Sequence, residues 1–266
     1  MKDLKPKYRI LVLTNFTRSS SHTLPMAIEL AKLVQGAIDV FGVKPVKGLP
    51  SESSQVRVLR DLKKRKEVLQ LKLKTRVEKF IQTQDIPMIY NAKIGHPVDA
   101  VREHIKLTKP DLVVLGNYHG MNSFWYRTTL LQTVLKCHRG VTLITRSKRF
   151  PSKQKALGLG FIGKFVDSHP MMQTLLKNAK GTHRLFQFST QANVCKSEHT
   201  NELVTYYFET NLENYANYSK YIENDNVHLL CIKKQLLPFK NCLTQQKRNL
   251  IKILSLTETP IMVFPN

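Results

Sequence analysis

Long apolar runs and clustered cysteines are both missing from this 266-residue chain. No stretch approaches the roughly 18 apolar residues that a membrane-spanning helix needs. The apolar run Ile10–Leu13 is too short for the core of a secretory signal. The four cysteines form no Cys-x-x-Cys pair, so neither a zinc site nor a disulfide framework is predicted. We therefore expect a cytoplasmic protein with reduced thiols, no metal site and no membrane contact.

Acidic residues are scarce as well. The chain holds 42 Lys and Arg against 19 Asp and Glu, a formal net charge of +23. Residues 1–150 hold 28 basic and 11 acidic residues, a net of +17, and residues 151–266 hold the other 14 and 8, a net of +6. The excess peaks in the segment Arg57–Lys79. A segment of this charge attracts nucleic acid, anionic lipid or an acidic protein.

The same segment has the apolar spacing of a helix. The apolar residues at that spacing are Leu62, Leu69, Leu73, Val77 and Phe80. They define one side of a helix and leave the basic residues on the other, where they can simply be solvated. No aromatic residue is interleaved with the charges, so nucleic-acid binding is not expected. A solvated face and contact with an acidic partner or another polyanion remain open.

The first half alternates strands and helices. Strands are expected at residues 8–14, 37–43, 86–95, 111–116 and 140–145. Between them we expect a helix ending at Gly36 and helices at 57–79, 96–108 and 128–138. This alternation predicts an α/β fold with a parallel sheet covered on both faces. Ligands of such sheets bind beyond the carboxyl ends of the strands, where the strand order reverses.

The second half repeats this order of elements. Ser147–Lys155 is polar and basic and contains a proline, as is typical of a linker. After it we expect strands at 156–162, 184–190, 202–208, 227–233 and 260–264, and helices at 168–181, 211–222 and 244–254. The chain is thus predicted to hold a duplicated five-strand unit, with domains at 1–150 and 151–266.

Four segments of the first half carry a resemblance to a known family. They read "ILVLTNFTRSSSHTLPMAIELAKLVQGAIDVFGV", "GHPVDAVREHI", "KPDLVVLGNYHG" and "TVLKCHRGVTLIT". In this order and spacing they resemble the universal stress protein family in its tandem, two-domain form. The second half resembles it more weakly, through its strand order and its ending "TETPIMVFP". The resemblance implies two Rossmann-like domains, each a five-stranded, mainly parallel sheet with helices on both faces.

The resemblance also implies a nucleotide site in the first domain. In family members that bind ATP, an acidic residue after the first strand and the main chain near the end of the second hold the nucleoside. Their phosphate motif is Gly, two residues, Gly, nine residues, then Gly followed by Ser or Thr. Carried onto this chain, the resemblance points to ATP or another adenine nucleotide with its accompanying Mg²⁺, held by Thr14, Asn15, Val43, Gly116, His119, Gly120, Thr128 and Thr129.

The chain departs from the family motif in several places. Asn15 stands at the acidic position and carries no charge. Three residues rather than two separate Gly116 from Gly120, seven rather than nine follow before Thr128, and Thr128 replaces the third glycine. Glycines let backbone N–H groups approach phosphate oxygens, so this loss weakens the predicted cradle. Trp125–Tyr126 adds bulk that can either fill the pocket or stack on a base.

The second domain lacks the motif. Residues 228–246, which follow its expected fourth strand, contain no glycine. Gly163 and Asp167 lie in its first turn, where Asp167 is expected to cap the next helix. We therefore expect this domain to be a structural support. The family resemblance implies that it pairs with the first domain through their last strands, and a homodimer of two chains is also expected.

An enzyme of related fold is the rival class. Such enzymes need a glycine-rich loop after the first strand or a His-x-Gly-His element, and "TNFTRSSS" and "KIGHP" supply neither. No paired carboxylates and no nucleophile elbow are evident. We expect a protein that acts in stress adaptation by binding, with at most weak ATP hydrolysis. The alternative is a protein-interaction module without nucleotide, whose basic helix 57–79 contacts an acidic partner or polyanion.

Overall fold

The structure is a computed structural model of the whole chain. It describes residues 6–14, 22–46, 55–116, 124–145, 157–163, 168–179, 183–189, 198–200, 203–209, 215–225, 227–236 and 257–265. The chain forms two compact units, Met1–Thr142 and Leu143–Asn266. The boundary lies a few residues before the segment 147–155, which the sequence predicts to be a linker and which lies outside the described residues.

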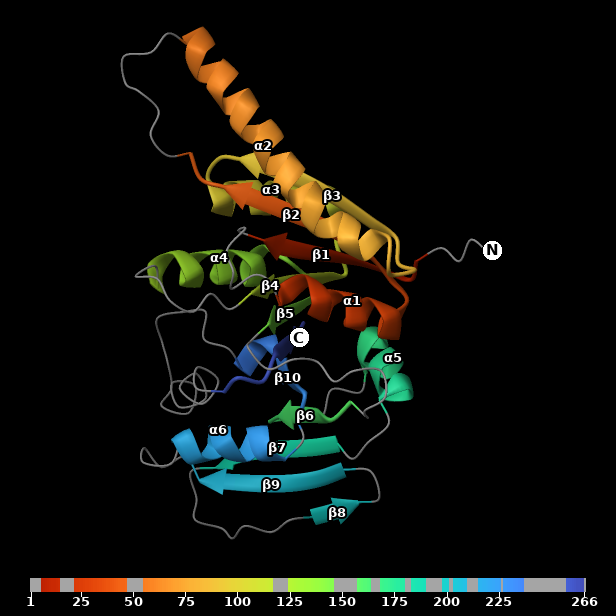
Figure 1. Cartoon of the computed structure of the whole chain (residues 1–266). Coiled ribbons are helices and arrows are strands. Elements are labelled where there is room, and N and C mark those ends of the chain that lie inside the picture. The colour runs from red at the N-terminus through yellow and green to blue at the C-terminus, as the bar shows by residue number, and fades with distance from the viewer. Residues whose placement is uncertain are drawn as a thin grey trace. The chain divides into compact units, whose positions relative to one another are not determined.

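The first unit alternates strands and helices as expected (Figure 1). Its elements are β1 (Tyr8–Thr14), α1 (Thr23–Val34), β2 (Gly36–Lys44), α2 (Gln55–Ile81), β3 (Met88–Ile94), α3 (Pro97–Thr108), β4 (Leu112–Gly116) and α4 (Phe124–Cys137). They are followed by β5 (Val141–Thr145), within which the boundary between the units falls. The strand order is β3-β2-β1-β4-β5. β1 pairs in parallel with both β2 and β4, and β2 pairs in parallel with β3. The predicted α/β fold is confirmed.

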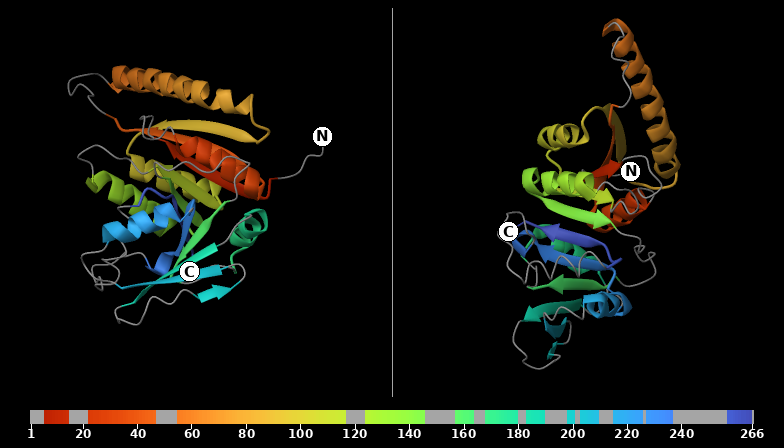
Figure 2. Two further views of the ribbon diagram at one scale, coloured as in Figure 1. Left: turned by 60° about the horizontal axis from the view of Figure 1, so that its bottom comes forward. Right: turned by 90° about the vertical axis from the view of Figure 1, so that its left-hand side faces the viewer.

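Helices cover both faces of this sheet. α1 and α2 lie on one face, and α3 and α4 lie on the other (Figure 2). Right-handed crossovers require this arrangement, because the chain moves outward from β1 to β3 and returns across the sheet to β4. The central strands are therefore buried on both faces. Ile10–Leu13 in β1 and Leu112–Leu115 in β4 are all buried, which explains their continuous apolar runs.

The second unit repeats the strand order with one addition. Its elements are β6 (Leu159–Ile162), α5 (Pro170–Asn178), β7 (His183–Ser189), β8 (Glu198–Thr200), β9 (Leu203–Glu209), α6 (Tyr215–Asn224), β10 (Leu229–Lys233) and β11 (Ile261–Phe264). The order is β11-β10-β6-β7-β9-β8. Without β8, this is the order of the first unit. The expected helix at 244–254 lies outside the described residues.

The strand β8 was not predicted. It pairs antiparallel with β9 at the edge of the sheet. Only residues 190–202 connect β7 to β9, whereas the first unit places the 27-residue helix α2 at this crossover. This connection is too short for a second α2, which makes the second unit an unequal copy of the first.

Aromatic packing organises one face of the second sheet. Phe186 of β7 stacks on Tyr206 and Phe208 of β9, and Tyr221 of α6 meets both β9 rings edge to face. Gly160 in β6 makes room for the Phe186 ring, since an added Cβ would lie 3.0 Å from its Cε2 atom. The N-terminal end of α5 packs on Phe264, whose side chain points to the opposite face.

Candidate functional site

The carboxyl ends of β2, β1 and β4 form the candidate site. The chain leaves β1 toward β2 on one side, and β4 pairs with β1 on the other, so the strand order reverses between β1 and β4. Leu13 pairs with Leu115 and Thr14 pairs with Gly42. This register brings three of the predicted site residues, Thr14, Val43 and Gly116, to one edge on neighbouring strands. Open α/β sheets bind ligands at such a point.

Burial differs among these three positions. Thr14 is half-buried, Gly116 is buried and Val43 is 7% exposed. The Val43 side chain is therefore largely committed to the core, and its main chain is the part that can face a ligand. A glycine at the end of β4 keeps this edge free of a side chain next to Thr14.

Gly95 lies beside this group. Its N–H donates to the carbonyl oxygen of Lys44 at 3.1 Å, which ties the end of β3 to the end of β2. Gly95 has a φ of 155°, and no atom of the described residues lies within 4 Å of the position that a Cβ would take. Pro97 then opens α3, where its missing N–H removes no helical hydrogen bond. The Gly-His-Pro turn thus leaves open space at the same edge of the sheet.

The remaining predicted residues fall in or after the loop that follows β1 or β4. Asn15, His119 and Gly120 lie outside the described residues. Thr128 and Thr129 lie in α4, which begins at Phe124 and not at the predicted Thr128. The backbone N–H groups left unbonded at the start of a helix therefore belong to Phe124–Arg127. Thr128 stands about 6 Å along the helix axis from the first helical residue.

The second unit ends its equivalent strands differently. β10, which corresponds to β4, ends at Lys233 where β4 ends at Gly116. A 3₁₀ turn, Lys234–Leu236, follows directly. Gly163, which follows β6, has a φ of 80°, and an added Cβ there would lie 3.0 Å from Leu236 Cδ1. The described part of this edge is thus filled by an apolar side chain. Asp167, the expected helix cap, lies outside the described residues.

A paired acid and histidine in the first unit were not singled out from the sequence. Asp39 of β2 and His104 of α3 meet at 2.6 Å between Oδ2 and Nε2, with side chains 16% and 12% exposed. The His104 ring stacks on Phe41 with centroids 3.9 Å apart. Asp39 Oδ1 is buried and has no hydrogen-bond partner among the described residues. The two residues are 65 positions apart, so only the isolated acid within an apolar strand hinted at a partner.

The described ranges contain neither a metal-binding cluster nor a membrane-spanning helix. There, no group of three or more His, Cys, Asp or Glu residues could hold a metal ion. In the same ranges, no helix is long and apolar enough to cross a membrane. Cys231 is a buried thiol, and burial raises the pKa of the Cys231 thiol well above its ordinary value. A thiol of this kind is chemically inert.

Two α/β units with this strand order define the class of fold. The structure has the fold of universal stress proteins along almost its whole length. A universal stress protein from Archaeoglobus fulgidus matches with a TM-score of 0.63 and 13% identity, over 97% of this chain and 96% of that chain. A putative universal stress protein from Pseudomonas aeruginosa matches with a TM-score of 0.56 and 9% identity, over 97% and 93%.

A third solved structure extends the same likeness. A functionally unknown protein from Pseudomonas aeruginosa matches with a TM-score of 0.56 and 11% identity, over 97% of this chain and 92% of that chain. No family model matches the sequence, and no curated protein matches it. The similarity therefore lies in the fold.

Proposed function

We propose that the first unit binds an adenine nucleotide, ATP in the first instance, and that the protein acts in stress adaptation through this binding. The observation that carries the proposal is the register of β2, β1 and β4. It brings Thr14, Val43 and Gly116 together at the point where the strand order reverses. The proposed place of action is the cytoplasm.

Each part of the edge has a distinct role in this proposal. The main chain at Val43 and the segment from Thr14 to Asn15 would hold the nucleoside. Gly116 and Gly120 would let the backbone approach the phosphates, because neither has a Cβ. The unbonded N–H groups at the start of α4 would add donors to the phosphate oxygens, with His119 beside them and the Thr128 and Thr129 hydroxyls one turn further along the helix. Bound Mg²⁺ would neutralise part of the phosphate charge.

We infer that this site acts by binding, with weak ATP hydrolysis as the most that it would catalyse. The first unit has no described cluster of carboxylates at the edge that could act as an acid and base pair, and Asp39 is already paired with His104 away from the strand ends. Binding therefore accounts for the arrangement without a chemical step.

Calorimetry with ATP tests the proposal directly. We expect a dissociation constant on the order of micromolar, and a loss of about tenfold or more in Gly116→Val, because a side chain would then stand between Thr14 and the phosphates. Lys233→Val, at the equivalent strand end of the second unit, is the matched control and should leave the affinity unchanged. Gly116 is buried, so a larger side chain there can destabilise the fold. The thermal midpoints of both variants must therefore be close to that of the parent chain.

Absence of binding up to millimolar ATP in the parent chain would make the nucleotide proposal wrong. The competing function is then a protein-interaction module, in which the two units pair within the chain or two chains form a homodimer, and the helix α2 contacts an acidic protein. The charge of α2 favours this second function.

A further inference from the structure

The amino-terminal half of α2, residues 56–68, is an outlying surface of the first unit. None of its residues is buried, whereas Leu69, Leu73 and Val77 in the other half all are. At 1.5 Å per residue, this half is about 20 Å long. Figure 1 shows α2 continuing past β2 and β3 at this end. The sheet therefore supports only the carboxyl-terminal half of the helix.

Apolar side chains on this half are unusually exposed. Val56 and Leu59 are 67% and 65% exposed, and Val68, on the opposite side of the helix from Leu59, is 54% exposed. Val58 and Leu62 are half-buried and precede Leu69 on the same side of the helix. The apolar stripe that enters the core thus continues beyond it. Contiguous exposed apolar residues with a polar rim are typical of an interaction site.

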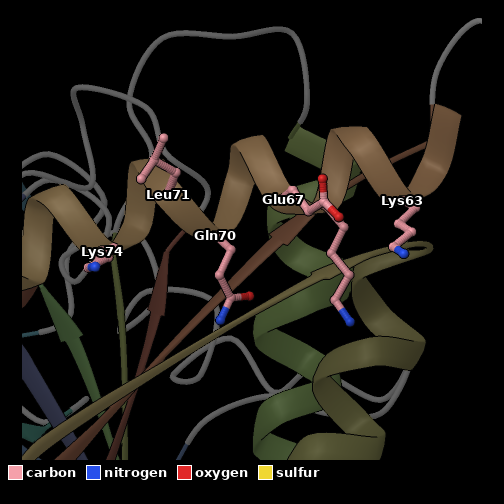
Figure 3. Close-up of a pocket in the computed structure, with 6 residues that line it drawn as sticks. Lys63, Glu67, Gln70, Leu71 and Lys74 are labelled. Atoms are coloured by element: carbon pink, nitrogen blue, oxygen red, sulfur yellow. The ribbon is translucent and has the colours of Figure 1, made fainter. Parts of the chain in front are cut away.

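Basic residues surround this apolar stripe. Residues 56–68 contain six basic and two acidic residues, a net of +4, with the basic ones at Arg57, Arg60, Lys63, Lys64, Arg65 and Lys66. An open hollow runs along the helix, lined by Lys63, Lys66, Glu67, Gln70, Leu71 and Lys74 (Figure 3). An apolar centre with a strongly positive rim is complementary to an acidic partner.

We propose that this surface, residues 56–68, together with the exposed side chains that line the hollow as far as Lys74, docks an acidic protein segment that presents apolar side chains at helical spacing. Its apolar residues would cover Leu59 and the half-buried Val58 and Leu62, and its carboxylates would face Lys63 and Lys66. An amphipathic helix that lays its apolar face on an apolar surface is a common mode of peptide recognition. This docking does not depend on the nucleotide proposal.

Other occupants fit the surface less well. A second copy of this chain carries +23 and the same basic helix, so like charges would face each other. A helix lying in a membrane needs one apolar side and benefits from aromatic residues. Here Arg57, Arg65 and Lys66 stand on different sides of the helix by their spacing, and residues 56–68 include no aromatic. Nucleic acid would not cover the exposed leucine and valine side chains.

Fluorescence anisotropy with synthetic peptides tests the proposal on the full chain. The probe is an acidic peptide of about 15 to 20 residues, with Leu at helical spacing and Glu at most other positions. A scrambled peptide of the same composition, whose leucines do not share one side, is the control probe. We expect the amphipathic peptide to bind at least about tenfold more tightly than the scrambled one, since only it can cover the apolar stripe.

Variants of exposed residues locate the binding surface. Leu59→Gln should weaken binding of the amphipathic peptide by about fivefold or more, and Lys63→Gln combined with Lys66→Gln should do the same while reducing its salt dependence. Leu107→Gln and Lys106→Gln are matched controls on α3, where Leu107 is 81% exposed. Both controls should bind like the parent chain.

Three outcomes would overturn the proposal. Equal binding of the two peptides would reduce the surface to a site for any polyanion. Insensitivity to Leu59→Gln would place the contact elsewhere. Tighter binding to vesicles of phosphatidylserine and phosphatidylcholine, or to duplex DNA, with loss in Leu59→Gln, would assign the surface to a membrane or to nucleic acid instead.

Discussion

At the scale of single residues, Asp39 and His104 connect the sheet to α3. Their side chains meet at 2.6 Å and are mostly removed from water, and the Phe41 ring covers the imidazole. Burying two polar groups is favourable only while each satisfies the other. The second oxygen of Asp39 finds no described partner, so the carboxylate relies on His104 for its only observed hydrogen bond.

This dependence predicts a non-additive pair of substitutions. His104→Phe keeps a ring against Phe41 but leaves the buried Asp39 without its partner, and we expect a loss of about 2 kcal/mol in the free energy of unfolding. Adding Asp39→Leu removes the stranded carboxylate and should restore stability to within about 1 kcal/mol of the parent chain. Urea unfolding of the parent chain, both single variants and the double variant provides the measurement.

This double-mutant cycle also defines the outcome that would contradict the proposed dependence of Asp39 on His104. If the losses of the two single variants simply add in the double variant, the two side chains do not depend on each other. The contact between β2 and α3 would then rest on apolar packing alone.

At the scale of elements, predictability follows burial and local signals. β1 was predicted at residues 8–14 and is observed at Tyr8–Thr14, because a continuous apolar run marks a strand buried on both faces. The apolar spacing of α2 identified Leu69, Leu73 and Val77, which are buried. The same spacing included Leu62, which is only half-buried. It therefore did not show where the sheet stops covering the apolar side of the helix. Spacing defines a side of a helix, and tertiary structure decides how much of it is covered.

The two misjudged elements lacked such signals. The start of α4 was placed at Thr128, after the bulky residues Trp125–Tyr126, because the family motif suggested a loop there. The helix begins at Phe124 instead. β8 is only three residues long and pairs antiparallel at the sheet edge. Three residues are too few for an alternation of apolar and polar residues to predict a strand. Of the candidate site, strand ends were predictable from the order of elements, whereas the loops between them were not.

The N-terminus of α5 carries a titratable cap. His169 precedes Pro170, and its Nδ1 accepts a hydrogen bond from the N–H of Met171 at 3.2 Å. Its ring packs edge to face on Phe264. Burial lowers the pKa of His169 from its ordinary value of 6.5. Protonation in the folded protein would remove the acceptor and place a positive charge at the positive end of the helix dipole.

The lowered pKa predicts a loss of stability on acidification. Below pH 6.5 the unfolded chain binds a proton at His169 more readily than the folded chain does, so stability rises with pH across the window between the folded pKa and 6.5. His169→Asn retains an acceptor at the cap and cannot titrate. Its thermal midpoint should therefore fall less than that of the parent chain between about pH 7 and pH 5. If the thermal midpoint fell equally with pH in the parent chain and in His169→Asn, His169 would not be the source of the pH dependence.

At the scale of the whole molecule, the two units share one strand order and differ at the ends of the strands. Both units have the same order of five strands. The residues at the carboxyl ends of these strands differ between the units. The first unit has Gly116 and the open turn at Gly95, whereas the second has Lys233, a 3₁₀ turn and Leu236 against Gly163. Core packing constrains strands in both units, and only a ligand would constrain their ends.

This asymmetry predicts one nucleotide per chain. If both units bound, calorimetry would give a stoichiometry of about two, but Leu236 occupies the place next to Gly163 and no glycine ends β10. We therefore expect a stoichiometry of about one for ATP, abolished by Gly116→Val and unaffected by Leu236→Ala. The second variant only opens space and supplies no backbone donors. A stoichiometry of two, or a second binding event gained in Leu236→Ala, would show that the second unit had kept a site that a single side chain conceals.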